Sequence, residues 1–183
     1  MSSKLYQGHL LVANPANPSD SLEQAVILLV THDENKAVGL QINRPLDELS
    51  LASIMENLSI PYDGDAPVYL GGSVNSNKIH IIHTTDWSGP ATQKINDVIS
   101  LTNDTSILRA LSKHKGPRKF IACSGHWLWE DHTLDQQLHP HEHLLHRWEV
   151  AEATEKSVFN IDPQDSWVQA IEMSADLRVS EWC

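Results

Sequence analysis

The sequence predicts an α/β protein of the α+β type: one compact domain, residues 1–183, in which helices pack on a mixed, largely antiparallel sheet. Its 183 residues, 40% hydrophobic and 20% charged, have the size and composition of a single globular domain. Short β-branched runs are interspersed with helical segments, and several runs are close enough in sequence to form hairpins. No internal repeat and no Pro-, Gly- or Ser-rich linker divides the chain.

Three strands are expected near the N-terminus. His9–Ala13 and Ala25–Thr31 are apolar, β-branched runs separated by a loop rich in Pro and Asn. Residues Ala37–Asn43 alternate between apolar and small or polar side chains, with the period of two that is typical of a half-buried strand. The polar segment His32–Lys36 joins the second run to the third, so the two runs are expected to form a β-hairpin.

Helices and further strands follow. Ser50 and Asp104 can each cap a helix, because both precede apolar residues at helical spacing. Another helix is expected from about Asp131 to Leu138, and a last one from Asp162-Pro163, since Pro at the first helical position loses no hydrogen bond. Strands are expected at Val68–Leu70, Ile79–His83, Ile95–Leu101 and Phe120–Cys123, and a late hairpin at Trp148–Ala153 with Lys156–Phe159.

Charge and hydropathy restrict the partners. The net charge is −11, with 24 acidic against 13 basic residues, so direct nucleic-acid binding is not expected. The longest apolar run, Ala25–Val30, is too short to cross a membrane. The N-terminus has no apolar stretch of signal-peptide length, and Cys123 and Cys183 are interpreted as reduced thiols. A cytoplasmic location is therefore expected.

Several segments form an ordered set of motifs along the chain. The sharpest are the GLQINRP element at 39–45 and the LGG element at 70–72, each a strand edge followed by residues that favour a turn. The other segments are Gly8–Pro15, Val68–Val74, Ser124–Trp129 and Phe159–Ile171. Together they resemble the YqgE/AlgH family of bacterial proteins. The resemblance implies a compact α/β domain with a mixed sheet. One branch of the family is named for an effect on alginate gene expression, so the resemblance also implies a regulatory role, without an agreed enzymatic activity.

Histidine is concentrated in one part of the sequence. Six of the eleven histidines lie between positions 126 and 146, and His139, His141 and His143 alternate so that an extended segment would present them on one side. These three are candidate metal ligands, with Glu142 and Asp131 as carboxylate partners and Zn or Ni as the metal. The alternative interpretation is a solvated, His-rich surface, because Pro140 interrupts any helix and no HExxH or CxxC spacing is present.

Three other motifs each allow two interpretations. Cys123-Ser124-Gly125-His126 follows a buried strand, where nucleophiles are often mounted, but it does not match GxSxG, and a structural Cys is favoured. Gly71-Gly72 could present backbone amides to an anion, although a tight turn explains the pair better. The tryptophans could form a partner surface or be mostly buried; they are Trp127, Trp129, Trp148 and Trp167.

These observations favour a non-enzymatic protein with a regulatory or protein-interaction role that works through a protein partner. Any effect on transcription is expected to be indirect, because the charge disfavours DNA binding. No cofactor is predicted under this hypothesis. The alternative is a metal-binding protein or metal-dependent enzyme that uses the His-rich segment 126–146. The sequence gives no prediction of oligomeric state.

Overall fold

The computed structural model describes residues 6–16, 20–130, 132–139 and 146–180. The helices of this part are a short 3-10 helix, η1 (Asp20–Leu22), and α1 (Leu51–Asn57), α2 (Thr105–Ser112), α3 (Thr133–Leu138), α4 (Glu155–Phe159) and α5 (Ser166–Ser180). The strands are β1 (His9–Ala13), β2 (Val26–His32), β3 (Lys36–Gln41), β4 (Pro45–Ser50), β5 (Pro67–Leu70), β6 (Val74–Thr84), β7 (Thr92–Lys94), β8 (Ile99–Thr102), β9 (Phe120–Glu130) and β10 (Trp148–Glu152).

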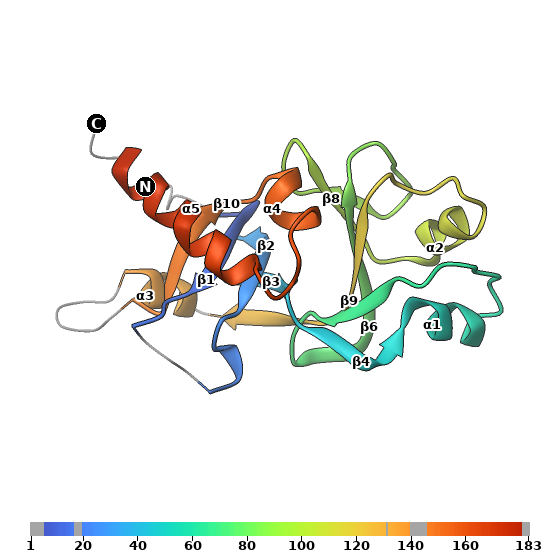
Figure 1. Cartoon of the computed structure of the whole chain (residues 1–183), viewed down its shortest axis with the longest axis horizontal. Helices are drawn as coiled ribbons and strands as arrows, with labels where there is room; N and C mark the ends of the chain where they lie inside the picture. The colour runs from blue at the N-terminus through green and yellow to red at the C-terminus, as the bar shows by residue number, and fades with distance from the viewer. Residues whose placement is uncertain (1–5, 17–19, 131, 140–145, 181–183) are drawn as a thin grey trace.

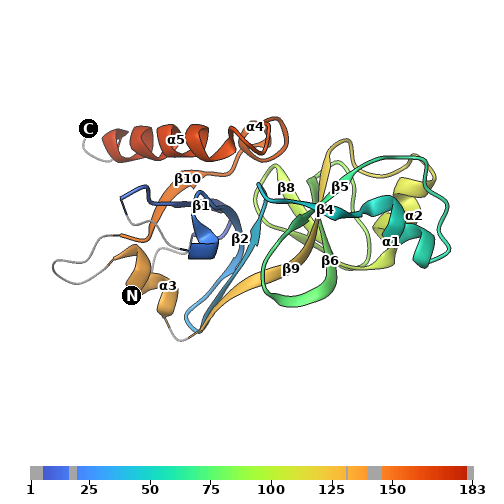
Figure 2. The same ribbon diagram turned by 60° about the horizontal axis from the view of Figure 1, so that its bottom comes forward.

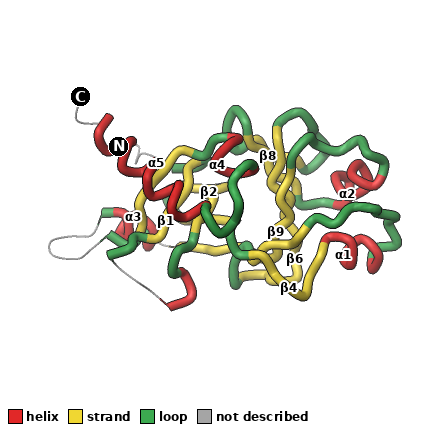
Figure 3. The backbone as a smooth tube through the Cα atoms, in the orientation of Figure 1, coloured by secondary structure: helices red, strands yellow, loops and turns green. Residues whose placement is uncertain are grey.

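These strands form one curled sheet in the order β10-β1-β2-β3-β9-β6-β8-β7, with β4 and β5 attached beside β9 (Figure 1, Figure 3). All the pairings are antiparallel except that of β5 with β9. The expected β2–β3 hairpin is present, with Leu28 opposite Leu40. The predicted α+β fold with a mixed, largely antiparallel sheet is confirmed.

The main hydrophobic core lies on the inner side of the curl. It takes buried side chains from β1, β2, β3, β6, β8 and β9, among them Leu10, Leu28, Leu40 and Ile82. The curl brings β7 back to β2, where the Gln93 amide donates to the Val30 carbonyl at 3.2 Å. Strands β1 and β2 are apolar runs because they are buried along most of their length.

Helices cover the sheet unevenly. Figure 2 shows α5 on one side of β10 and β1 and α3 on the other, while α1 and α2 lie at the far end of the molecule. Trp129 and Trp148 are buried in the core beneath α3, and both indole N–H groups donate to the Gln137 side-chain oxygen, at 3.2 and 2.8 Å. Trp167 donates to the Ala13 carbonyl. The buried interpretation is confirmed for Trp129 and Trp148, whereas Trp127 and Trp167 are half-buried. No helix in the described ranges is long and apolar enough to cross a membrane.

Ser50 caps α1 as the sequence predicts. Its hydroxyl accepts the Ser53 amide at 3.2 Å, and the Ser53 hydroxyl accepts the Ser50 amide at 3.4 Å, which completes a capping box. We expect Ser50→Ala to lower the free energy of unfolding by about 1 kcal/mol in urea denaturation, because the Ser53 amide at the start of the helix loses its partner. Ser88→Ala, at an exposed position outside any helix, is the control; equal stability of the two variants would contradict the role of the cap.

Two strand predictions are wrong. Lys156–Phe159 does not pair with β10 but belongs to α4, because Thr154 and Ser157 form a second capping box. The expected strand Ile95–Leu101 is broken by Asn96, whose side-chain oxygen accepts the amides of Val98 and Ile99, at 3.0 and 2.8 Å. This turn separates β7 from β8, which form a hairpin in its place.

The predicted start of the last helix is also displaced. Asp162 and Pro163 lie in a turn, in which the Gln164 amide donates to the Asp162 carboxylate at 2.9 Å and the Asp165 amide to the Asp162 carbonyl at 3.0 Å. Helix α5 begins three residues after Pro163, at Ser166. The local hydrogen bonds of Asp162 therefore favour a turn over the first helical residues.

Gly71 and Gly72 allow the backbone after β5 to cross closely over the backbone of β9. A Cβ at Gly72 would lie 2.0 Å from the carbonyl carbon of His126, and one at Gly71 would lie 2.3 Å from the Gly125 carbonyl oxygen. Gly125 itself has φ = +70° and interrupts the regular pairing of β9 with β6. Glycine is required here because the chain after β5 passes directly against β9.

Candidate functional site

The structure disperses the histidines in the part of the 126–146 segment that it describes. His139 is exposed at the C-terminal end of α3, and His146 Nδ1 lies 2.7 Å from the Leu138 carbonyl oxygen. His141, His143, Glu142 and Asp131 lie outside the described residues. Within the described ranges, no group of three or more His, Cys, Asp or Glu side chains could hold a metal ion. The metal site at His139, His141 and His143 stays a prediction.

Asp135 on α3 joins two histidines. One carboxylate oxygen lies 3.4 Å from His132 Nδ1 and the other 3.4 Å from His32 Nε2. The buried His32 accepts the Tyr6 amide on Nδ1 at 3.0 Å, so its ring proton is on Nε2, facing Asp135. This arrangement attaches α3 and the N-terminal segment to β2. Its role is structural, because neither nitrogen of His32 is left for a ligand.

A buried histidine pair forms between β6 and β9. His80 lies opposite Cys123 in the sheet register, and its ring meets that of His126 edge to face, with centroids 5.5 Å apart. His80 is only 6% exposed, and neither of its ring nitrogens has a hydrogen-bond partner within the described structure. Burial lowers the pKa of His80 to about 4, with smaller contributions from His126 and Lys78. Both imidazoles are therefore neutral near pH 7, since burial also lowers the pKa of His126.

The contact between His80 and His126 is not predictable from the sequence. Their contact depends on the β6–β9 register and on the irregularity between Val74 and Ile79, which sequence spacing does not give. The one sequence feature that indicates an unusual histidine here is the position of His80 between the apolar Ile79 and Ile81 in a predicted strand. A buried polar group without a partner is costly, so the His80 ring lowers the stability of the core.

The Cys123-Ser124 motif does not form a catalytic nucleophile. Cys123 is fully buried, and burial raises the pKa of its thiol, which therefore stays protonated. The Ser124 hydroxyl donates to the Ser76 carbonyl instead of to a base. One hydroxyl–histidine pair is formed by Thr102 and His83 Nε2 at 2.9 Å, but both residues are completely buried. A substrate cannot reach either of them.

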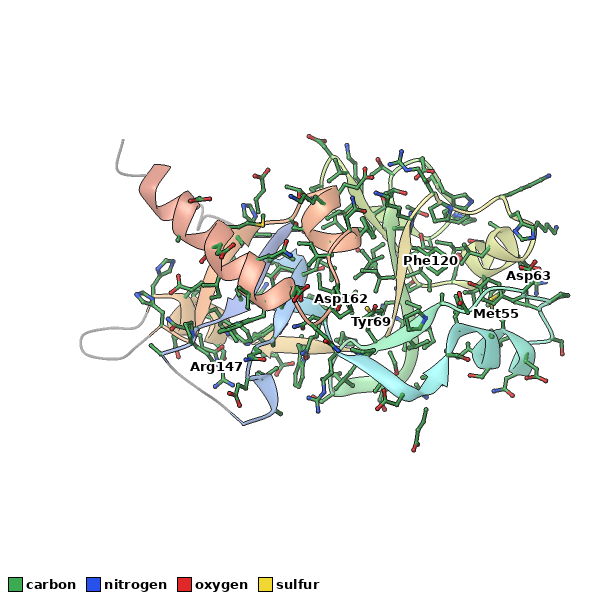
Figure 4. All side chains as sticks on the ribbon, viewed as in Figure 1. Met55, Asp63, Tyr69, Phe120, Arg147 and Asp162 are labelled. Atoms are coloured by element: carbon green, nitrogen blue, oxygen red, sulfur yellow. The ribbon has the colours of Figure 1, made fainter. Side chains whose placement is uncertain are left out.

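A large pocket lies between α1 and α2, over the outer face of β6 and β9. We call it the α1–α2 pocket; its volume is about 490 Å³. Its walls are largely apolar and are formed by Leu49, Ile54, Leu58, Ile79, Ile81 and Leu108. Figure 4 labels Met55 on α1 at this end of the molecule and Arg147 at the opposite end. Pockets of 300–1,000 Å³ with apolar walls are typical small-molecule sites, so this is the best candidate site.

Polar side chains surround the apolar walls. Asn57, Asn77, Asn103 and Lys78 line the pocket, and the side chains of these four form no hydrogen bond or ion pair with any described residue. Asp104 also lines it, but its carboxylate caps α2 by accepting the Ser106 amide at 3.0 Å and the Ser106 hydroxyl. The pocket thus combines an apolar body with three free amides and one free ammonium group.

The comparisons with known proteins agree on one family. A model of the AlgH-like family matches residues 10–176. A UPF0301 protein of Actinobacillus pleuropneumoniae is 32% identical over 174 residues, covering 91% of this chain and 90% of the relative. A UPF0301 protein of Sphingopyxis alaskensis is 28% identical over 177 residues, covering 95% of this chain and 92% of the relative.

Two solved structures have the same fold. The AlgH protein of Pseudomonas aeruginosa matches with a TM-score of 0.76 and 26% identity, over 94% of this chain and 90% of that chain. A protein of Corynebacterium diphtheriae matches with a TM-score of 0.68 over 89% and 85% of the two chains, and at 19% identity this likeness concerns the fold alone. The resemblance to the YqgE/AlgH family is confirmed. Because the family model spans nearly the whole chain, the protein belongs to the AlgH-like family.

Proposed function

We propose that this is a cytosolic, non-enzymatic regulatory protein that binds a small amphiphilic molecule in the α1–α2 pocket and acts through a protein partner. The observation that carries the proposal is the pocket itself: about 490 Å³ of space with apolar walls, bordered by polar side chains that have no partner within the described structure. Apolar walls supply affinity by removing ligand surface from water, and the few polar groups orient the ligand.

Two observations support binding over catalysis. The Cys123 thiol is buried and protonated, and the Ser124 hydroxyl, which lines the pocket, donates to a backbone carbonyl. Neither is therefore activated as a nucleophile. The free, buried Cys123 also fits a reducing compartment.

The regulatory part of the proposal is supported by membership of the AlgH-like family. We propose that an effect on transcription is indirect, because a net charge of −11 repels nucleic acid. A protein partner that binds the ligand-bound form of the protein would not be subject to this repulsion. Leu58, which is 46% exposed at the pocket edge, is a residue that ligand and partner would both contact.

The proposal is tested with Nile red, a neutral apolar dye whose fluorescence rises on leaving water. We expect wild-type protein to bind the dye, and Ile54→Trp to weaken binding by about tenfold or more, because the indole fills the pocket and removes apolar contact area. Val168→Trp, on an exposed position of α5, is the matched control and should bind like wild type. Dye binding that Ile54→Trp leaves unchanged, in a folded protein, would refute the pocket assignment.

A further inference from the structure

We infer that the ligand of the α1–α2 pocket is a monoanionic amphiphile, of the class of medium-chain carboxylates, with its charged head at Lys78 and its apolar chain between α1 and α2. This inference rests on the proposed function and specifies the ligand. It follows from three properties of the pocket: the position of Lys78, the hydrogen bonds that engage the Asp104 carboxylate, and the presence of a single basic residue in the described lining.

Lys78 is the lysine of the pocket lining and has no anionic partner within the described residues. Lys94, by contrast, pairs with Asp97 at 3.0 Å, and Lys119 pairs with Glu155 at 2.8 Å. Lys78 and Ile79 are neighbours in β6, and both line the pocket. Successive side chains of a strand point to opposite faces, so Ile79 forms the wall and the exposed Lys78 lies at the pocket edge. A ligand with its chain against Ile79 would meet the ammonium group with its head at this edge.

Asp104 does not favour a cationic ligand, because its carboxylate is engaged. It accepts the Ser106 amide and hydroxyl at the start of α2, where a negative charge is stabilised by the helix dipole. The Asp104 carboxylate is most stable when it caps α2. The charged group still available to a ligand in the pocket is thus Lys78, which selects an anion.

The number of charges points to a single negative charge on the ligand. Among the described residues that line the pocket, Lys78 is the one with a basic side chain. The other polar residues there include Asn57, Asn77 and Asn103. Their amide N–H groups can donate to carboxylate oxygens but bring no charge. A nucleotide or diphosphate carries more negative charge than one ammonium neutralises, and such ligands are usually held by several cationic groups or backbone amides.

The overall charge of −11 does not cancel this local attraction. Charges farther away than the Debye length, about 8 Å at physiological ionic strength, are largely screened, whereas a head group in contact with Lys78 is not. The walls then contribute in proportion to the apolar area they cover, and they include Leu49, Leu58 and Leu108.

The inference is tested by displacing Nile red with three ten-carbon compounds at concentrations where each is monomeric: decanoate, decanol and decylammonium. We expect decanoate to bind about threefold more tightly than decanol, because an ion pair with an exposed ammonium group adds only a few-fold in affinity. Decylammonium should bind more weakly than decanol. Lys78→Met should reduce decanoate to the affinity of decanol and leave decanol unchanged.

Lys115→Met is the matched control, since it removes the same charge from an exposed position after α2 and should leave decanoate binding intact. Equal binding of decanoate and decanol by wild type, or equal decanoate binding by the Lys78→Met variant, overturns this inference while the pocket proposal stands. A protein that binds neither the dye nor any of the three compounds refutes the proposed function together with the inference.

Discussion

Gly72→Ala is expected to destabilise the protein by about 3 kcal/mol or more, the upper range for overpacking of a core. A Cβ at this position would lie 2.0 Å from the His126 carbonyl carbon and 2.3 Å from the Trp127 amide nitrogen. Both atoms belong to the backbone of β9, so no side-chain rotation relieves the clash. Separation of the segment after β5 from β9 would disturb the neighbouring β5–β9 pairing, in which Leu70 lies opposite Ser124.

Urea denaturation of wild type and Gly72→Ala measures this loss. Gly64→Ala is the control, because the atoms nearest to its Cβ are the ring and hydroxyl of the Tyr62 side chain, which can rotate away. We expect Gly64→Ala to cost about 1 kcal/mol or less. A Gly72→Ala protein as stable as Gly64→Ala would show that the two backbones do not approach so closely.

Acid is expected to destabilise the protein through His80, by on the order of 2–3 kcal/mol between pH 6.5 and pH 4. The pKa of His80 is about 4 in the folded protein, mainly because the ring is buried, against 6.5 for a free histidine. In this pH window the unfolded chain binds a proton that the folded protein does not bind. Stability is therefore complete above pH 6.5 and falls as the pH falls towards 4.

His80→Met removes the titrating group and keeps a side chain able to pack in a core. The free energy of unfolding, measured in urea at pH 7.5, 6.5, 5.5 and 4.5, should fall less steeply for this variant than for wild type. His139→Gln removes an exposed histidine whose side chain has no ion pair among the described residues, and its pH profile should follow wild type. Parallel profiles for wild type and His80→Met would show that His80 is protonated in the folded protein.

Local sequence signals were sufficient for much of the fold. The β2–β3 hairpin is predicted by two apolar runs around a polar turn, and α1 by the Ser50 cap before helical spacing. Where prediction failed, a second local signal was stronger: Thr154 with Ser157 specifies α4 although Val158 and Phe159 favour a strand. Such boxes are visible in sequence and should outweigh β propensity over short segments.

The candidate site could not be predicted in the same way. The α1–α2 pocket gathers side chains from β4, α1, β6, α2 and β9, and none of these segments alone carries a motif for a ligand. Nothing in the sequence distinguishes Lys78 from the other lysines. Its position in the pocket lining and its lack of an ion-pair partner among the described residues are known only from the structure. The histidine concentration, by contrast, was the most visible feature of the sequence, and its described members do not converge.

Chemical-shift mapping of ¹⁵N-labelled protein titrated with decanoate tests the central claim, that the α1–α2 pocket is the binding site, most directly. We predict saturable shifts that are largest at the amides of Asn77, Lys78, Asn103 and Leu108, which line the pocket. The amides of Gln137 and Trp148, beside the core beneath α3, should stay unchanged. Saturation without shifts at the pocket, or shifts centred on Gln137 and Trp148, would contradict the account.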